Sequence, residues 1–584
     1  MKNYIPINKI NESRISFRTT IQNIINSFSP LEKAVFGIFT LLLIISACIL
    51  LIRVNNLLLI EVPAHGGSIT EGIIGSPRFI NPVLAISDSD RDLTALIYSG
   101  LMRASSDGTL IPDLAREYSI SEDGKTYTFA LKDNITFHDD TPVTADDIIF
   151  TVAMAQNSIV KSPRRANWDG VIVQKIDEKT IEFILPQPYA PFLENTTIGI
   201  LPKHIWQDVP PEQFPFSQFN VEPIGSGPFL VTSIKRNSSG LPDSYKVSSF
   251  ANFALGAPFL TSVTFRFYSN EEALIAGYNN GDVDAINSIS PERAKALKLH
   301  SAHIETKPLP RIFGVFFNQN QADIFVDEKV REALAIAVPK EKIIDDVLGG
   351  YAVVINSPIP PGILKNPTPV ELKDAETRNA DALQILESDG WKKDEETGVL
   401  TKETKKDGIK RLSFSISTSN TIELKSVASI VADAWRSLGA EIDLRFFEIS
   451  DLNQNVIRSR DYDALLFGEI VGRELDLFSF WHSSQRNDPG LNIALYANIA
   501  VDKILEQARA HINQEERYEL FEKFEQDVQA EYPAVFLYAP LFIYIVPDKI
   551  HDLSLGSITT SSERFANIYS WYIETEYVWP FFTH

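Results

Sequence analysis

An uncharged apolar run of nineteen residues, Ala34–Ile52 (AVFGIFTLLLIISACILLI), most restricts what this chain can form. A helix rises about 1.5 Å per residue, so this run would be about 28 Å long, close to the hydrocarbon thickness of a bilayer. Helices buried in soluble cores seldom run this long without a charge. The sequence therefore predicts a transmembrane anchor at residues 34–53, after an N-terminal segment at 1–33 and before a spacer at 54–65.

Basic residues beside this run predict its orientation. Those before it outnumber the acidic ones: Lys2, Lys9, Arg14, Arg18 and Lys33 against Glu12 and Glu32. Short loops rich in Lys and Arg stay in the cytoplasm. We therefore expect a single-pass protein of the cell membrane, with a cytoplasmic N-terminus and a large domain in the periplasm or at the cell surface. The segment through Arg53 carries +4 of the net −22, which leaves −26 on the rest and argues against nucleic acid as a partner.

Two other interpretations of the apolar run stay open. A cleaved secretory signal has a short basic start and an apolar core of about 7–15 residues, and both are exceeded here. A lipoprotein signal is suggested by Ile45–Cys48 (ISAC), which resembles a lipobox and contains the only cysteine. Apolar residues continue directly past that cysteine, where a mature lipoprotein normally turns polar. An uncleaved anchor is therefore favoured over both.

The chain offers no recognisable catalytic motif. It lacks a Gly-x-Ser-x-Gly elbow, a phosphate loop with Gly-Lys-Ser/Thr and a His-Glu-x-x-His stretch. A single cysteine excludes an intramolecular disulfide and a cysteine-based zinc site. His300 and His303 have metal-ligand spacing but few carboxylates nearby, and His138 precedes two aspartates in what we interpret as a polar turn. We therefore predict a protein that is not an enzyme, with no catalytic residue, metal or cofactor.

Residue patterns after the spacer predict a mixed α/β protein. Tyr127, Phe129 and Leu131 alternate as in a half-buried strand, and Thr144 and Asp327 are candidate N-caps of helices. The clearest unit is a helix with apolar residues from Val427 to Leu438, then a glycine cap and the alternating strand Ile442–Phe446. About 520 residues are too many for one core, so two or more lobes are expected.

One block of more than thirty residues resembles a known family. It contains Pro112–Arg116 (PDLAR), Tyr118–Tyr127 (YSISEDGKTY) and Ile135–Asp147 (ITFHDDTPVTADD). Further matching stretches follow the same order in the family: Leu93–Leu101, Pro223–Phe229 (PIGSGPF), Gly281–Asp284, Val330–Leu334, Ser388–Trp391, Tyr462-Asp463 and Trp481–Ser484. Over residues 66–544 the chain resembles family 5 of the bacterial extracellular solute-binding proteins, the oligopeptide and dipeptide receptors of ABC importers.

The resemblance implies a fold and a function. The fold would be two-lobed and periplasmic-binding-protein-like (type II), with a hinge. Lobe I would span 66–310, with a family-specific subdomain at about 101–200, lobe II would span 311–491, and 492–584 would return to lobe I. A monomeric receptor would capture peptide between the lobes for ABC permease and ATPase subunits. The alternatives are a nickel chelate, an oligosaccharide or an opine as ligand, a sensor that has lost transport, and a membrane-anchored hydrolase.

The sequence departs from the family at two places. Asp140 stands where the family usually has glycine, which indicates a different turn. In peptide receptors an aspartate pairs with the α-amino group of the ligand, and the ungapped alignment from Tyr462-Asp463 places that position on Gly472. Glu474 or Asp476 would replace the missing carboxylate only if the loop is rearranged.

Eight residues are candidate ligand contacts, each with a structural alternative. Trp481 is a wall for an apolar ligand group or a core tryptophan. Arg473, Glu474 and Asp476 offer charges for ligand termini or form ordinary ion pairs in an exposed loop. The stretch Gly225, Ser226, Gly227 and Phe229 lets the backbone approach a ligand closely or forms a plain tight turn.

Overall fold

The computed structural model describes residues 22, 24–105, 108–364, 374–404 and 408–582. The predicted cytoplasmic segment 1–33 lies mostly outside these residues. The chain forms two compact units, one of residues 1–64 with 574–584 and the other of residues 65–573.

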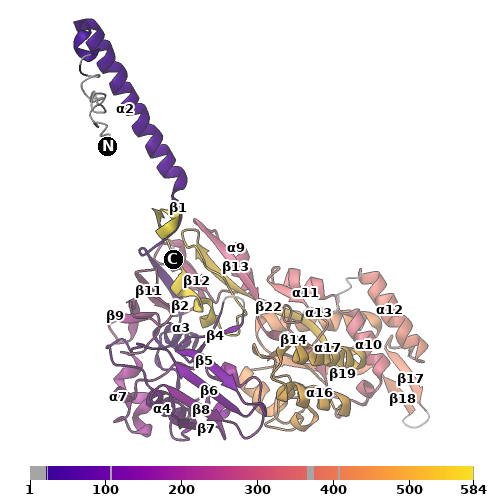
Figure 1. The fold of residues 1–584 in the computed structure, drawn as a ribbon. Helices are drawn as coiled ribbons and strands as arrows, with labels where there is room; N and C mark the ends of the chain where they lie inside the picture. Colours follow the sequence, from indigo (N-terminus) through magenta and orange to yellow (C-terminus); the bar gives the residue numbers. More distant parts are fainter. Residues whose placement is uncertain (1–21, 23, 106–107, 365–373, 405–407, 583–584) are drawn as a thin grey trace, which may run out of the picture. The chain divides into compact units, whose positions relative to one another are not determined.

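The smaller unit holds the apolar helix and one pair of strands (Figure 1). Helix α2 (Pro30–Leu58) begins at Ser29, whose side chain accepts a hydrogen bond from the N–H of Glu32 while the Glu32 carboxylate accepts one from Ser29. None of its residues is buried, so a helix over the apolar run is confirmed and extends past it at both ends. Strand β1 (Ile60–Ala64) follows and pairs antiparallel with β23 (Glu574–Val578). Helix and strand therefore occupy the predicted spacer.

The larger unit is built on a twelve-stranded mixed sheet in the order β20-β19-β21-β14-β22-β12-β2-β11-β10-β9, with β13 and β15 also paired to β22. In the first part of the chain the strands are β2 (Ser68–Ile74), β3 (Met102–Ala104), β4 (Leu110–Pro112), β5 (Ala115–Ile120), β6 (Thr126–Leu131), β7 (Ile172–Lys175), β8 (Thr180–Ile184), β9 (Phe229–Arg236), β10 (Pro242–Ser249), β11 (Ser262–Tyr268), β12 (Ala285–Asn287) and β13 (Ala302–Pro308). The helices there are α3 (Asp88–Ile97), α4 (Ala145–Gln156), α5 (Arg165–Trp168), α6 (Phe192–Asn195), α7 (Lys203–Trp206), α8 (Glu271–Asn279) and α9 (Pro291–Ala296). Strands β5-β6-β8-β7 form a separate sheet.

The later strands are β14 (Arg311–Phe317), β15 (Ala352–Val354), β16 (Lys392–Lys393), β17 (Leu400–Thr404), β18 (Gly408–Arg411), β19 (Ser413–Ser419), β20 (Glu441–Phe447), β21 (Ala464–Ile470) and β22 (Ala534–Pro547). The helices are α10 (Glu328–Ala337), α11 (Lys340–Asp346), α12 (Ala375–Ser388), α13 (Ile422–Leu438), α14 (Ile449–Asp451), α15 (Phe478–Trp481), α16 (Ile499–Ala510) and α17 (Gln514–Glu531). A 3₁₀ helix, η6 (Ser561–Phe565), lies near the C-terminus.

Buried side chains divide this unit into two lobes. Two clusters draw on residues 69–309 and 542–571, and two others draw on residues 312–539. We call these groups the first and second lobes. Strand β22 belongs to both, because its residues 534–538 pair with β14 and its residues 541–547 pair with β13. The chain thus passes between the lobes at 309–312 and at 539–542, and the two-lobed α/β fold is confirmed.

Several local predictions are confirmed. Tyr127, Phe129 and Leu131 are the buried side chains of β6. Asp327 caps α10, accepting a hydrogen bond from the N–H of Lys329. Helix α13 ends at Gly439, which has φ of 106°, and β20 follows directly. A glycine suits this left-handed position because it has no Cβ to clash.

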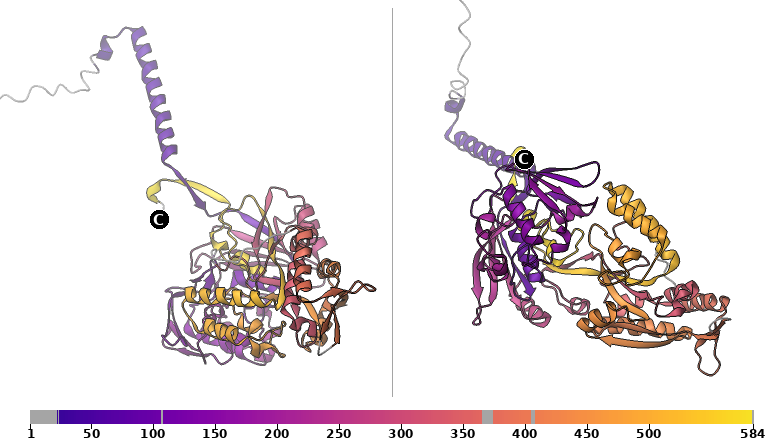
Figure 2. Two further views of the ribbon diagram at one scale, coloured as in Figure 1. Left: turned by 90° about the vertical axis from the view of Figure 1, so that its right-hand side faces the viewer. Right: turned by 90° about the horizontal axis from the view of Figure 1, so that it is seen from below.

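The C-terminal region is arranged differently from the expected return to lobe I at 492. Helices α16 and α17, which lie side by side in Figure 2, pack into a core with Ile312, Phe316 and Trp481 of the second lobe. Their buried residues, among them Ile504, Leu505, Phe521 and Phe524, face that core. Only after the crossing in β22 does the chain rejoin the first lobe.

Candidate functional site

A cavity of about 720 Å³ lies between the two lobes. The first lobe contributes helix α3, the segments 164–171 and 185–199 and the 3₁₀ helix η6, and the second contributes the loop after β21 and Arg509 of α16. The charged residues of its wall are Arg91, Arg103, Asp113, Arg164, Asp169, Glu194, Arg473, Glu474, Asp476, Arg509 and Glu563. A volume of this size is typical of small-molecule sites, which span roughly 300–1,000 Å³.

The predicted charged residues Arg473, Glu474 and Asp476 all line this cavity. They lie in the loop between β21 and α15, where Gly472 has φ of 80° and Leu475 has φ of 50°. These left-handed positions turn the chain sharply, and successive side chains of the loop point in different directions as a result. The position of the missing family aspartate, Gly472, is therefore a turn residue.

Each of these charges already has a partner of opposite sign. The Arg473 guanidinium donates to the Glu563 carboxylate over 2.7 Å. Arg517 donates to the Glu474 carboxylate over 3.0 Å, and Arg509 binds the Asp476 carboxylate through two hydrogen bonds of 2.8 and 2.5 Å. The loop is therefore held by a set of ion pairs, which lie at the cavity rather than on an open surface.

Several hydrogen bonds join the two lobes at the cavity. Arg473 of the second lobe reaches both Glu563 and the carbonyl oxygen of Ser557, at 3.1 Å, in the first lobe. The hydroxyl of Tyr189 in the first lobe donates to Asp476 over 3.2 Å, and the N–H of Ala190 donates to the carbonyl of Arg509 over 2.9 Å. Separating the lobes requires all of these bonds to break.

The residue next to Glu563 anchors it within the first lobe. Arg564 is fully buried and forms two hydrogen bonds of 2.8 Å to the Asp92 carboxylate of α3. It also lies 3.0 Å from the Glu71 carboxylate, which accepts a hydrogen bond from Tyr544. A buried, bidentate pair of this kind is geometrically specific. It fixes η6, and with it the position of Glu563 on the cavity wall.

Other polar groups of the cavity remain open to a ligand. Within the part of the chain that the structure describes, the Nε atoms of Arg91 and Arg473 are buried without a hydrogen-bond partner, and the Arg164 side chain forms no hydrogen bond. Partial removal from water lowers the pKa of Arg164, although the residue as a whole stays exposed, and Arg91 nearby lowers it further, while Glu194 and Glu563 oppose both effects. The Arg164 guanidinium thus lies among cations and anions without a fixed partner.

Glu194 is the carboxyl group most affected by this environment. Burial raises its pKa to about 7, and the neighbouring Glu563 and Glu474 raise it too, against the lowering by Arg473. Glu563 is shifted the same way, because burial raises its pKa more than Arg473 lowers it. The cavity therefore changes charge close to neutral pH.

Trp481 lies in the core of the second lobe. Its side chain is fully buried and packs against Phe316, Tyr496, Phe524 and Phe536. It is not part of the cavity wall. The short helix α15 points it inward, away from the loop that carries the charged residues.

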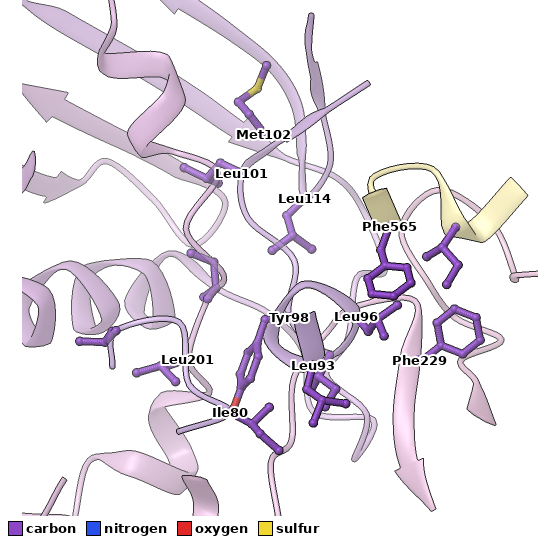
Figure 3. Packing of buried hydrophobic residues seen from close by; sticks show 14 of the residues in the cluster. Ile80, Leu93, Leu96, Tyr98, Leu101, Met102, Leu114, Leu201, Phe229 and Phe565 are labelled. Carbon is purple, nitrogen blue, oxygen red and sulfur yellow. The ribbon is translucent and has the colours of Figure 1, made fainter. Parts of the chain in front are cut away.

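The stretch Gly225, Ser226, Gly227 and Phe229 also lies outside the cavity wall. The N–H of Gly227 donates to the carbonyl of Ile97 over 2.8 Å, at the end of α3, and a Cβ on either glycine would collide with that backbone. The His138 ring accepts a hydrogen bond from the N–H of Gly225 and donates one to the carbonyl of Gly227. Phe229 is fully buried in the core near Phe565 and Leu96 (Figure 3). The two glycines thus allow a close approach to the backbone at the end of α3 and not to a ligand.

Sequence reasoning missed Arg164, Glu194, Arg509 and Glu563. Each lies outside the stretches that match family motifs, and nothing in the local pattern marks an arginine or glutamate as facing a cavity. Within the described ranges, no group of three or more His, Cys, Asp or Glu residues is placed to hold a metal ion. The arrangement is suited to holding a polar solute through charge and hydrogen bonding.

Comparison with known proteins gives consistent matches. Residues 109–488 match the sequence model described as bacterial extracellular solute-binding proteins, family 5 middle. The oligopeptide-binding protein AppA of Bacillus subtilis is 27% identical over 494 residues, which cover 84% of this chain and 89% of AppA. The structure of that protein with a nonapeptide has a TM-score of 0.64 at 26% identity and covers 88% of this chain and 100% of the other.

Two further solved structures have comparable similarity. The ABC transporter substrate-binding protein CtaP of Listeria monocytogenes has a TM-score of 0.71 at 26% identity, covering 87% of this chain and 99% of CtaP. NikZ of Campylobacter jejuni in complex with Ni(L-His) has a TM-score of 0.65 at 25% identity, covering 86% of this chain and 99% of NikZ.

Proposed function

The chain belongs to family 5 of the bacterial extracellular solute-binding proteins, and on that premise we propose that it is a membrane-anchored receptor that captures peptides for an ABC importer. The observation that carries the proposal is the cavity between the lobes, which is lined by charged groups from both. A ligand that touches both walls stabilises the joined lobes by its extra affinity for that arrangement. The similarity to AppA, whose structure contains a nonapeptide, supports a peptide as the ligand.

The free groups of the cavity indicate how a peptide is held. The carboxylate of the peptide binds the guanidinium of Arg164, which has no other hydrogen-bond partner in the described chain, with the Nε–H of Arg91 as a second donor. The ion pairs of Glu474 and Asp476 with Arg517 and Arg509 shape the wall rather than replace the missing family aspartate.

Helix α2 is the proposed membrane anchor. It is long and apolar enough to cross a bilayer, and none of its residues is buried. An anchored receptor keeps its ligand close to the permease, which raises the effective concentration of the loaded form there. The basic N-terminal segment supports a cytoplasmic start and an extracytoplasmic body.

The proposal is tested by identifying what the protein carries. The full chain is purified in detergent from its native host and denatured, and the released small molecules are identified by mass spectrometry. Titration calorimetry then measures binding of the peptides found, with Arg164→Met as the variant and Arg165→Met, on the same short segment, as the control. Release of peptides, with binding lost in R164M and kept in R165M, supports the proposal. Release of a chelate or oligosaccharide in place of peptides overturns it.

A metal chelate is the second candidate ligand. The similarity to NikZ, solved with Ni(L-His), favours it, because free arginines such as Arg164 suit the carboxylate of an amino-acid chelate as well as that of a peptide. Calorimetry with nickel–histidine and with a dipeptide of similar size separates the two candidates.

A further inference from the structure

The C-terminal strand lies directly beside the end of the apolar helix. Strand β23 pairs antiparallel with β1, and the register places Val578 opposite Ile60, two residues after α2 ends at Leu58. Because the strands are antiparallel, β23 runs toward the helix end as β1 runs away from it. Val578 therefore lies beside the first residues that follow α2.

The aromatic residues at this end are Tyr577 and Phe581, which are exposed, and Trp579, which is half-buried. The exposed fractions of Tyr577 and Phe581 are 66% and 64%. Trp579 packs against Phe581 with ring centroids 5.8 Å apart and ring planes tilted by 32°, so these two side chains lie together. Apolar side chains of the helix end add to the same region, since Leu57 is 82% and Ile60 is 41% exposed. We call Tyr577, Trp579 and Phe581 the aromatic cluster.

The helix geometry places this cluster at the membrane surface. From the last residue of the uncharged run, Ile52, to the helix end at Leu58 the helix advances about 9 Å. The headgroup layer on each side of the hydrocarbon is about 5–8 Å thick. The end of α2 and the neighbouring cluster therefore lie at the outer boundary of that layer, within reach of aromatic side chains. Trp and Tyr favour this layer because their rings are apolar and their N–H and O–H groups remain hydrated.

We propose that the aromatic cluster at residues 577–581 is a second membrane contact, inserted into the headgroup layer beside the anchor. This inference rests on the proposal that α2 spans the bilayer. The acidic residues Glu61, Glu574 and Glu576 lie on the same pair of strands, so the partner surface is zwitterionic lipid rather than strongly anionic lipid. The contact ties the C-terminal end of the chain to the membrane as well as the N-terminal one.

The tryptophans of the chain make this inference directly testable. Of the seven tryptophans, Trp168, Trp206, Trp391, Trp435, Trp481 and Trp571 are each at most 2% exposed. Trp579 is therefore the tryptophan available to quenchers. The apolar helix itself contains none.

The experiment uses the full chain in phosphatidylcholine nanodiscs with and without lipids brominated near the headgroup, with tryptophan emission as the readout. We expect the brominated lipid to quench emission of the wild type but not of Trp579→Phe, which keeps an aromatic ring and so preserves the fold. Lipids brominated at the ends of their acyl chains should quench the tryptophan emission less. Including phosphatidylglycerol should weaken the quenching.

The other outcomes overturn the inference. If soluble acrylamide quenches Trp579 and brominated lipid does not, the cluster lies in water. If neither quenches it, a protein surface covers the cluster. Failure of the anchor is recognised separately, because the chain then does not co-elute with the nanodiscs at all.

Discussion

The Arg473 guanidinium donates a hydrogen bond of 2.7 Å to the Glu563 carboxylate, joining residues 90 positions apart across the cavity. The side chains of Arg473 and Glu563 are only 6% and 24% exposed. Arg473 comes from the loop after β21 in the second lobe, and Glu563 from η6 in the first. This bond can therefore form only when the two lobes are joined.

Replacing Arg473 should weaken the joined form. In Arg473→Met the Glu563 carboxylate stays buried without its partner, a loss that costs about 3–5 kcal/mol for buried pairs. We expect peptide affinity to fall by two orders of magnitude or so, at about 1.4 kcal/mol per factor of ten, measured by calorimetry. Arg458→Met removes an arginine that is 69% exposed and is the control. Adding Glu563→Gln to R473M should restore part of the affinity, and unchanged binding in R473M would contradict this role.

Glu194 should make ligand capture depend on pH. Its pKa is raised to about 7 with the lobes joined and should be near its ordinary 4.5 when the lobes separate and water reaches it. A raised pKa means that its contribution to the joined form is complete below pH 4.5 and is lost as the pH rises through 7. Peptide affinity should therefore be about tenfold weaker at pH 8 than at pH 5, a value set below the full shift because the side chain is partly exposed. Glu194→Gln should flatten this profile, and a profile equally steep in E194Q would exclude Glu194 as its source.

Gly225 should prove structural rather than ligand-binding. A Cβ at this position collides with the carbonyl of Ile97, so Gly225→Ala should destabilise the protein by about 1–3 kcal/mol or more, as overpacking does. Ser226→Ala is the matched control, because its buried hydroxyl has no partner among the described residues and its removal should cost little. Thermal unfolding measures both. Loss of peptide binding in a G225A protein of normal stability would point to a ligand contact instead.

Glu469 should limit stability at high pH. Both of its carboxylate oxygens are buried without a partner in the described part of the chain, and burial raises its pKa well above the usual value. The cost of burying this group is smallest below pH 4.5, where it is protonated, and it grows as the pH rises toward the raised pKa. Glu469→Leu should therefore stabilise the protein by about 1–3 kcal/mol, more at pH 9 than at pH 5.

The matched variant for this prediction is Glu469→Gln. It removes the titration but keeps an unpartnered polar group, so it should lose the pH dependence and gain less stability than E469L. Melting temperatures at both pH values test this. If the stability of the wild type changed between pH 5 and pH 9 in parallel with that of E469L, Glu469 would not be the source of the pH dependence.

Local order is what the sequence by itself determined. The apolar run, the caps at Asp327 and Gly439 and the alternation in β6 depend on neighbours within a few residues, so their patterns are legible before folding. The block of family motifs indicated membership of family 5, and that resemblance predicted the two lobes. The charged residues Arg473, Glu474 and Asp476 were recognised as a group because they are contiguous.

Only the tertiary structure decided what those residues touch. Whether Trp481 faces a cavity or a core depends on helices α16 and α17, which come after it in the chain. The partner of Arg473 is 90 residues away, and the shift of Glu194 arises from burial between two lobes. Such contacts depend on the folded geometry of distant segments, because desolvation and charge act through space and leave no local pattern in the sequence.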